Sequence, residues 1–229
     1  MAERGPLDMG EDGLVPVVAQ DHLTGEVRMV AFATMEAVRH TLETKRATFW
    51  SRSRGELWEK GRTSGNAMDV TGVLVDCDAD TLIYLVAPRG PSCHTGAASC
   101  FFRRLVLEDG ALAVRDDEVP ATDLLSRLER TLEARKSSTA GTSYVRSLYD
   151  GGAAKIGAKV REEADELARA IADESDERVV SEAADVLFHV MVALRSRDVS
   201  LSSVLGELER RSGTSGHVEK AARGVGRKS

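Results

Sequence analysis

Hydrophobic residues in the first half of the chain recur at alternate positions or in short runs, and Gly, Asp and Pro separate the runs. Both patterns are typical of β-strands, and they predict strands at 15–20, 26–33, 47–53, 71–76 and 81–86. One helix is predicted at 35–45, where Val38 and Leu42 lie four positions apart and Thr34 is placed to cap the first turn. Mixed strands with one main helix predict an α+β amino-terminal domain, expected over 14–110.

The second half of the chain has a helical period instead. An acid-rich stretch with a Gly turn and a Pro, at 108–120, indicates a boundary between the halves. The expected helical segments are a first one with Leu124, Leu125, Leu128 and Leu132 after a cap at Thr122 or Asp123, a long run ending at Ile171, a third over 177–195, and a fourth from Ser200 through Leu201, Val204, Leu205 and Leu208.

Short connections between these segments predict three or four antiparallel helices, an all-α helical bundle over 120–211. A gap rich in Ser, Thr and Gly at 137–143 follows the first helix, and Gly151 with Gly152 should break or bend the long run. The tail at 212–229 is rich in Gly and Ser and is expected to be disordered.

Composition limits the classes of function. The chain has 229 residues, 42% of them hydrophobic and 30% charged, which is ordinary for a globular protein. A net charge of −6 argues against a nucleic-acid partner bound through an overall positive field. No apolar run is long enough to span a membrane, so we expect a cytoplasmic protein without a membrane partner. Three cysteines are too few, and odd in number, for a disulfide framework.

The three cysteines and a histidine form the first candidate site. Cys77, Cys93 and Cys100 are separated by 16 and 7 positions, and His94 follows the second thiol. This spacing excludes a zinc ribbon or finger, because no C-x-x-C pair is present. Three protein ligands and one open position are the arrangement of a hydrolytic zinc site. The alternative is that the reduced cysteines are small core residues.

Three aspartates surround the first of these cysteines. In an extended segment Asp76, Asp78 and Asp80 would all lie on one face of the strand, opposite Cys77. Three carboxylates on one face repel each other unless a hard cation such as Mg²⁺ or Ca²⁺ lies among them. An EF-hand is excluded, since Thr81 stands where that loop requires Gly. A solvated acidic turn is the other reading of this segment.

A basic segment is the candidate for holding a phosphate-bearing ligand. Residues 45–62 carry six Lys or Arg residues against two Glu residues, and T-S-G-N follows at 63–66. Arg forks, hydroxyl groups and a Gly that permits close backbone approach suit a phosphate. The candidate binding residues are Trp50, Arg52, Arg54, Lys60, Thr63, Ser64, Gly65 and Asn66. A basic, solvated hairpin with tryptophans packed underneath is equally open on these residues alone.

These motifs together resemble the phosphoribosyl-AMP cyclohydrolase family of histidine biosynthesis. The resemblance covers roughly 14–106 and is carried by W-S-R-S-R-G-E-L-W-E-K-G-R-T-S-G-N, D-C-D-A-D and G-P-S-C-H-T-G-A-A-S-C-F-F-R. It implies hydrolytic opening of the adenine ring between N1 and C6 of phosphoribosyl-AMP.

The same resemblance implies a homodimer with metal sites in both subunits. The three cysteines would ligate zinc, with ligands drawn from both subunits, and the three aspartates would hold Mg²⁺. Collapse of a tetrahedral centre at C6 needs proton transfer to N1, and His94 is the histidine next to a proposed ligand. We therefore expect His94 to shuttle that proton, although a histidine beside a ligand can instead only orient the site.

Carboxylates on two helix flanks form the second candidate site. The predicted apolar stripe of the long helix contains Ile156, Val160, Ala164, Leu167 and Ile171, with Glu162, Glu163 and Glu166 on its flank and Glu163 nearly in the stripe. The next helix has Val179, Ala183, Val186 and Val190 inward, with Glu182, Asp185 and His189 on the corresponding flank. Partly desolvated carboxylates would rise in pKa or bind a divalent metal such as Mg²⁺. The alternative is a solvated flank, salt-bridged by Lys155, Lys159, Arg161 and Arg169.

E-E-x-x-E followed by E-x-x-D looks like the metal motif of the all-α NTP pyrophosphohydrolases. The surrounding sequence, over about 121–211, is similar to phosphoribosyl-ATP pyrophosphatase, which releases pyrophosphate and yields phosphoribosyl-AMP. The resemblance implies Mg²⁺ bound by these carboxylates and a catalytic Glu163. Arg161 departs from the family pattern, where Gly is expected before the paired glutamates. The candidate phosphate contacts are Lys136, Tyr144, Arg146 and Lys159.

The sequence thus predicts a fused bifunctional hydrolase that acts on small nucleotide substrates with Zn²⁺ and Mg²⁺, the later reaction lying first in the chain. Two rivals remain at this point. One is a general nucleotide-pool pyrophosphatase that carries a degenerate metal-binding domain. The other is a scaffold stabilised by zinc, with a dimerising helical bundle.

Overall fold

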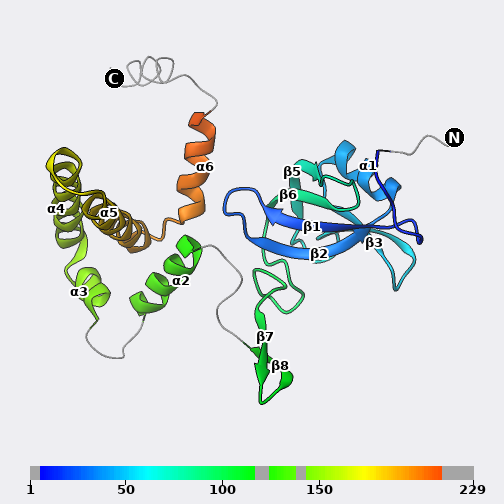
Figure 1. Ribbon diagram of the computed structural model, residues 1–229, viewed down its shortest axis with the longest axis horizontal. Helices are drawn as coiled ribbons and strands as arrows, with labels where there is room; N and C mark the ends of the chain where they lie inside the picture. Colours follow the sequence, from blue (N-terminus) through cyan, green and yellow to red (C-terminus); the bar gives the residue numbers. More distant parts are fainter. Residues whose placement is uncertain (1–5, 117–123, 138–142, 213–229) are drawn as a thin grey trace. The chain divides into compact units, whose positions relative to one another are not determined.

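The computed structural model describes residues 6–116, 124–137 and 143–212 (Figure 1). The chain divides after residue 123 into two compact units. The first unit contains mixed strands and a helix and the second is helical, so the predicted fold classes are confirmed. The predicted cap at Thr122 or Asp123 and the predicted tail beyond Ser212 lie outside the described residues.

A six-stranded sheet organises the amino-terminal unit. Its strands are β1 (Val15–Asp21), β2 (Val27–Ala33), β3 (Thr48–Ser51), β4 (Glu56–Glu59), β5 (Met68–Val75) and β6 (Leu82–Pro88), in the order β4-β3-β2-β1-β6-β5. Only the pair β1 and β6 is parallel; the other neighbours in this sheet are antiparallel. β4 was not among the predicted strands, but its pairing with β3 makes the basic segment the hairpin that the alternative reading proposed.

The core of this unit lies between the sheet and helix α1 (Met35–Thr44). Alternate residues of β1 are buried, as its sequence pattern predicts, and the ring of Phe49 stacks on that of Tyr84 at 5.6 Å. The Thr34 hydroxyl oxygen accepts a hydrogen bond from the backbone N–H of Ala37 at 3.2 Å. The predicted helix cap is therefore confirmed.

A separate hairpin follows the sheet, made of β7 (Arg103–Glu108) and β8 (Ala111–Asp116). Its turn is Asp109–Gly110, both at positive φ (49° and 81°), which is the two-residue turn that Asp-Gly favours. The predicted boundary stretch thus contains a strand, and Asp-Gly between alternating apolar residues was the signal for it. The cross-strand pairs Leu105–Val114 and Leu107–Leu112 form an apolar ladder that is 60–73% exposed, and Figure 1 shows the hairpin projecting from the sheet.

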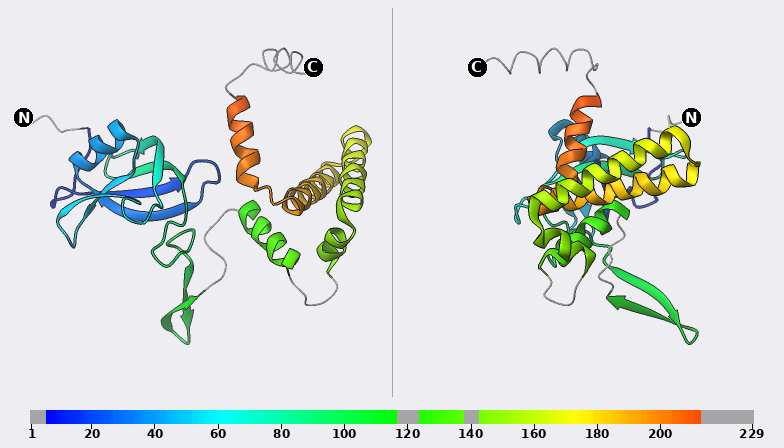
Figure 2. Two further views of the ribbon diagram at one scale, coloured as in Figure 1. Left: turned by 180° about the vertical axis from the view of Figure 1, so that it is seen from behind. Right: turned by 90° about the vertical axis from the view of Figure 1, so that its left-hand side faces the viewer.

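Helices make up the described part of the carboxy-terminal unit (Figure 2). They are α2 (Leu124–Ser137), α3 (Tyr144–Asp150), α4 (Gly152–Asp173), α5 (Asp176–Ser196) and α6 (Leu201–Ser212). The predicted break is confirmed, because α3 ends before Gly151 and Gly152 begins α4 at a φ of +64°. The core includes Leu132, Leu148, Ile156 and Val192. Among the described residues, no helix has both the length and the apolar character that a bilayer span needs.

The buried line of α4 corrects the predicted stripe. Ile156, Glu163 and Ala170 are buried at intervals of seven residues, whereas Ala164 and Ile171 are exposed. A helix that packs along a long partner, here α5, keeps a seven-residue contact repeat, and a stripe drawn at 3.6 residues per turn drifts away from it. The consequence for function is that Glu163, predicted to lie nearly in the apolar stripe, is itself part of the buried line of α4.

Candidate active sites

Two of the three cysteines lie together. The turn from Cys93 to Ala97 brings Cys93 back beside Cys100, and the two thiol groups interact. A hydrogen bond from the Thr95 hydroxyl, at 3.2 Å from Sγ, lowers the pKa of Cys93. Burial, and then the charge of Cys93, raise the pKa of Cys100 to about 11. A cation beside both sulfurs would favour ionisation of the second thiol.

A cavity of about 600 Å³ opens beside this thiol pair. Its lining includes five residues of the predicted ligand segment together with Cys93, His94 and Cys100; the five are Arg54, Lys60, Thr63, Ser64 and Asn66. Lys60 is buried, which lowers its pKa, and its ammonium donates to the backbone carbonyl of Asn66 at 3.2 Å. An ammonium, hydroxyl groups and an amide around one hollow are a suitable environment for a phosphorylated ribose.

Other residues of the predicted ligand segment lie elsewhere. Trp50 and Gly65 are not part of the cavity lining, and the Arg52 guanidinium lies over the ring of Phe32, 4.1 Å from its centre. Trp58 lines the cavity in place of Trp50. The sequence alone could not show which tryptophan faces the cavity, because that depends on how β3 pairs with β4. In this hairpin Trp58 lies opposite Phe49.

A buried ion pair supports the segment that carries Cys100. The Arg28 guanidinium contacts Asp21 at 2.7 Å and Glu26 at 3.1 Å, and it donates to the backbone carbonyl of Ala98 at 3.2 Å. The backbone carbonyl of Arg28 accepts from the N–H of Cys100 at 2.9 Å. Burial raises the pKa of Asp21, but the hydrogen bond from Arg28 and two backbone N–H groups lower it overall. This cluster therefore couples the start of β2 to a candidate metal ligand.

Replacing Asp21 tests this support. Asp21→Asn should lower the free energy of unfolding of the amino-terminal unit by about 1.5–3 kcal/mol at pH 7, the range for hydrogen bonds to a charged group. Because the folded-state pKa is lowered, the carboxylate stabilises fully above its unfolded pKa of about 3.9 and loses that contribution as the pH falls through the folded value. Urea unfolding followed by tryptophan fluorescence reports this unit alone, since both tryptophans lie in it.

The matched control is Asp116→Asn, which alters an exposed aspartate at the end of β8. We expect it to leave the urea midpoint of unfolding unchanged at pH 7 and at pH 3. A deficit of Asp21→Asn that stays the same at pH 7 and pH 3 would contradict the assigned ion pair.

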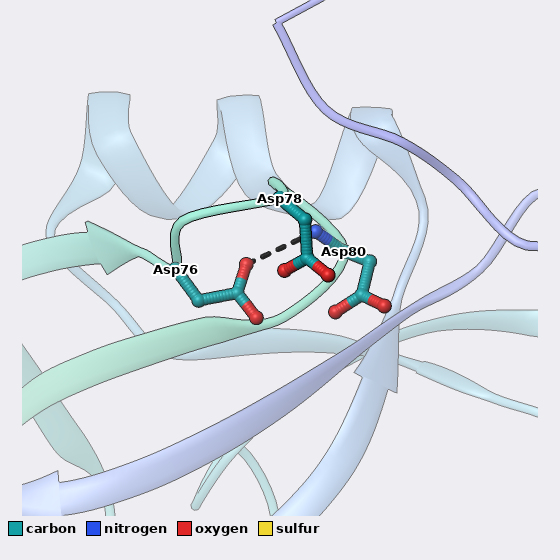
Figure 3. Close-up of side chains that lie close together, drawn as sticks. All are labelled: Asp76, Asp78 and Asp80. Atoms are coloured by element: carbon teal, nitrogen blue, oxygen red, sulfur yellow. Dashed lines mark hydrogen bonds between the residues drawn. The ribbon is translucent and has the colours of Figure 1, made fainter.

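The three aspartates gather in a turn rather than on a strand (Figure 3). β5 ends at Val75, Ala79 has a φ of +64°, and one carboxylate oxygen from each aspartate lies within 4.8 Å of the others. The premise of an extended segment was wrong, yet the grouping of Asp76, Asp78 and Asp80 is present. Burial would raise the pKa of Asp76, but hydrogen bonds from the backbone N–H groups of the turn lower it overall.

Cys77 lies in this turn, apart from the other two thiols. It is exposed, with Sγ 3.9 Å from a carboxylate oxygen of Asp78. Within the described part of one chain, the groups of three or more ligands that could hold a metal are two sets of carboxylates, and neither set includes a sulfur. A single chain therefore offers two of the three predicted zinc ligands at one place.

The second set of carboxylates lies between α4 and α5. Oxygens of Glu163, Glu166 and Glu182 are within 4.8 Å of one another, and Glu163 and Glu182 are buried. Burial, together with the neighbouring carboxylates, raises the pKa of Glu182 although Arg178 opposes the shift. Acids this close repel one another, and here ion pairs from Lys159 to Glu163, Arg169 to Glu166 and Arg178 to Glu182 offset the repulsion. A divalent cation among the three carboxylates would offset it as well. Asp185 is exposed at the edge of this cluster.

Glu162 and the predicted phosphate contacts divide into two groups. The Lys159 ammonium lies 2.8 Å from a carboxylate oxygen of Glu163 and 2.9 Å from one of Glu162, so Lys159 and Glu162 adjoin the cluster. Lys136 instead donates to the backbone carbonyl of Arg195 near the end of α5.

Two further residues of that prediction lie on α3. Arg146 forms an ion pair with Asp150, and Tyr144 extends its hydroxyl to the imidazole of His189. Arg161 is exposed on α4. His189 was placed on the acidic flank from its spacing but was not a candidate site residue; its burial could not be predicted from spacing alone.

Comparison with known proteins gives two adjacent family matches. A model of the phosphoribosyl-AMP cyclohydrolase family matches residues 29–102, and one of the phosphoribosyl-ATP pyrophosphohydrolase family matches residues 125–212. The chain is 42% identical to the histidine biosynthesis bifunctional protein HisIE of Deinococcus radiodurans, over 94% of this chain and 96% of the relative. It is 39% identical to the HisIE protein of Bacillus subtilis, over 92% of this chain and 97% of that one.

Proposed function

Because the chain belongs to the family of histidine biosynthesis bifunctional proteins, we propose that its thiol pair and its buried carboxylate cluster are the centres of two successive active sites. The protein is a hydrolase with phosphoribosyl-ATP pyrophosphohydrolase and phosphoribosyl-AMP cyclohydrolase activities. The first activity releases pyrophosphate and leaves phosphoribosyl-AMP, which the second opens between N1 and C6. We assign these activities to the helical unit and the α+β unit respectively, and we place the enzyme in the cytoplasm with its nucleotide substrates.

The observation that carries the ring-opening assignment is the thiol pair at the edge of the cavity. Cys93 and Cys100 suit a soft metal, and a third thiol would complete the ligand set of a hydrolytic zinc site. Zinc bound there would supply a water molecule acidic enough to act as hydroxide near neutral pH. The Asp76–Asp80 turn has the oxygen chemistry of a Mg²⁺ site next to the third thiol, Cys77.

The cavity residues position the substrate for attack at C6. Lys60 and Arg54 would neutralise its phosphates, and the hydroxyl and amide groups at 63–66 would bind phosphate and ribose oxygens. His94 lines the same cavity, with Nδ1 3.9 Å from Sγ of Cys93. His94 would carry the proton of the attacking water to N1 as the N1–C6 bond breaks, which leaves oxygen on C6 and hydrogen on N1.

The helical unit has the groups for phosphoanhydride hydrolysis. Glu163, Glu166 and Glu182 would hold Mg²⁺ with their carboxylate oxygens, and Asp185 would join them from the edge. Mg²⁺ bound there would orient the triphosphate and neutralise its charge. Glu163 would orient the attacking water and accept its proton, and Lys159, paired with it in this structure, would turn to a phosphate when substrate binds.

A homodimer would complete the ring-opening site. Cys77 is exposed and apart from Cys93 and Cys100, so a second copy can supply the missing thiol. Exposed apolar surface supports association of both units: the ladder on β7 and β8, Leu74 and Val75 just before Cys77, and Ile171, Val180 and Leu187 on α4 and α5. We propose that the zinc site is shared between the two subunits of this dimer.

One assay tests the whole assignment. When phosphoribosyl-ATP is supplied, pyrophosphate should appear first and the ultraviolet change of ring opening should follow it. A zinc-selective chelator should slow ring opening at least tenfold without changing pyrophosphate release, because the two reactions use different metals. Ring opening that survives zinc removal would contradict the thiolate site. Hydrolysis of plain ATP as fast as that of phosphoribosyl-ATP would contradict the substrate assignment.

A further inference from the structure

A buried histidine links two helices beside the carboxylate cluster of the helical unit. His189 on α5 is 3% exposed, and its Nε2 lies 2.7 Å from the hydroxyl oxygen of Tyr144, the first residue of α3. Its other ring nitrogen, Nδ1, lies 2.9 Å from the backbone carbonyl oxygen of Asp185 and 3.6 Å from a carboxylate oxygen of Glu163. The proposed mechanism gives this histidine no role.

These neighbours determine the tautomer of the imidazole. The carbonyl oxygen of Asp185 and the carboxylate of Glu163 can only accept hydrogen bonds, so Nδ1 carries the proton. When the ring carries only that proton, Nε2 is an acceptor and the Tyr144 hydroxyl donates its hydrogen to it. Both polar atoms of a buried ring are thereby satisfied.

This direction of donation changes what Tyr144 can do in the site. Its hydroxyl hydrogen is used by His189, so the oxygen presents only lone pairs to a ligand. A phosphate oxygen, which is also an acceptor, is then a poor partner, although a phosphate contact was the prediction for Tyr144 from the sequence. The suitable partner is a hydrogen-bond donor, such as a water molecule or a ribose hydroxyl.

Packing keeps Tyr144 in this orientation. Its ring stacks on Phe188 at 6.4 Å and meets the ring of His189 edge-on at 5.9 Å, while about half of the residue stays exposed. The neighbouring charges are those of Glu163, Glu162, Asp185 and of Lys159, which is paired with Glu163. The exposed part of Tyr144 therefore adjoins the charged groups that surround the metal position.

We propose that His189 is a positioning residue for pyrophosphate release: through Nε2 it holds the Tyr144 hydroxyl as an acceptor for a donor group of the bound substrate or its attacking water, while Nδ1 fixes the ring on the backbone carbonyl of Asp185. This inference rests on the assignment of pyrophosphohydrolase activity to the carboxylate cluster. It adds Tyr144 as a residue that accepts a hydrogen bond from the substrate or the attacking water. It adds His189 as the residue that makes the Tyr144 hydroxyl an acceptor.

Two substitutions of His189 separate its two nitrogens. The amide of Gln can reach the position of Nε2 and accept from Tyr144, whereas the shorter Asn places an N–H near the position of Nδ1 and leaves Tyr144 without a partner. We expect His189→Asn and Tyr144→Phe each to lower kcat/KM for phosphoribosyl-ATP by about 3- to 10-fold, the range for one hydrogen bond. The double variant should be no worse than either single one, because both remove the same contact.

The His189→Gln variant should give the opposite result in the same double-mutant cycle with Tyr144→Phe. In the His189→Gln background, Tyr144→Phe should still cost its full factor, since the contact to Tyr144 is retained. Tyr149→Phe is the matched control, because it removes a hydroxyl from the same helix that contacts only the backbone carbonyl of Leu132, at 3.4 Å. Ring opening of supplied phosphoribosyl-AMP, measured on every variant of the full chain, shows that the variants are folded and active elsewhere.

Multiplicative losses for His189→Asn and Tyr144→Phe, or equal behaviour of the Asn and Gln variants, would overturn the proposal. If His189→Asn does not fold, nitrogen NMR of the imidazole in the unaltered protein decides the question. A ring protonated at Nδ1 alone supports the proposal, and one protonated at Nε2, with or without a proton on Nδ1, overturns it. Failure of the underlying site assignment would look different, because pyrophosphate release would then survive Glu182→Gln.

Discussion

Cys93→Ser should reduce ring opening of phosphoribosyl-AMP to below about 1% of the wild-type rate while pyrophosphate release continues unchanged, because a three-ligand zinc site does not tolerate loss of a thiolate. The same loss is expected for Cys77→Ser, although Cys77 is exposed and apart from Cys93 in one chain. Zinc content measured on each purified variant should fall with the activity.

Mixing the two inactive variants should restore activity. In a heterodimer, Cys93 and Cys100 of the Cys77→Ser chain meet the intact Cys77 of the other chain, so one of the two shared sites is complete. Random association of equal amounts makes half of the dimers mixed, and about a quarter of the wild-type sites should return in a twofold-symmetric dimer. Coexpression of differently tagged chains, followed by zinc analysis and the ultraviolet assay, measures this recovery.

The chain offers a matched control for this experiment. Cys93→Ser mixed with Cys100→Ser should restore nothing, because both changes lie in the pair that one subunit supplies and every shared site stays broken. Recovery in this control mixture, or its absence in the Cys77 mixture, would contradict a site divided in this way.

Several features were predictable from the sequence because they depend on local periodicity. Alternate burial along β1 and the Thr34 cap of α1 follow from residue order alone, and so does the break of the helical run at Gly152. The two acidic flanks were likewise recognisable, since residues three and four apart share one side of a helix.

Other features depend on packing partners that a sequence does not specify. Glu163 was predicted to lie nearly in the apolar stripe, but its place in the buried line itself was not predictable, because the phase of the contact stripe on α4 is set by its pairing with α5. The Asp76–Asp80 turn closes through backbone N–H groups that donate to Asp76, a contact invisible in the strand pattern. Sequence spacing also could not show that Cys77 lies apart from the other thiols.

The buried carboxylates of the helical unit lead to the second large effect. Glu182→Gln should lower pyrophosphate release by about 100-fold or more, because metal-assisted stabilisation of the transition state contributes several kcal/mol. Ring opening of supplied phosphoribosyl-AMP should be unaffected. When both proteins are free of Mg²⁺, the Glu182→Gln variant should unfold at a higher Tm than the wild type. Burial and neighbouring carboxylates raise the pKa of Glu182, so a negative charge is unfavourable at this position in the folded protein.

Mg²⁺ should reverse that order of stability. A cation that binds only the folded state raises the Tm of the wild type by mass action, and the Gln variant should lose most of this shift. Glu174→Gln is the matched control: Glu174 also contacts Arg178, at 2.9 Å, but lies outside the carboxylate cluster. It should keep both the Mg²⁺ shift and pyrophosphate release. If Glu182→Gln and Glu174→Gln behave alike, the role of Glu182 is its ion pair with Arg178 and not a metal, and the electrostatic argument for this site fails.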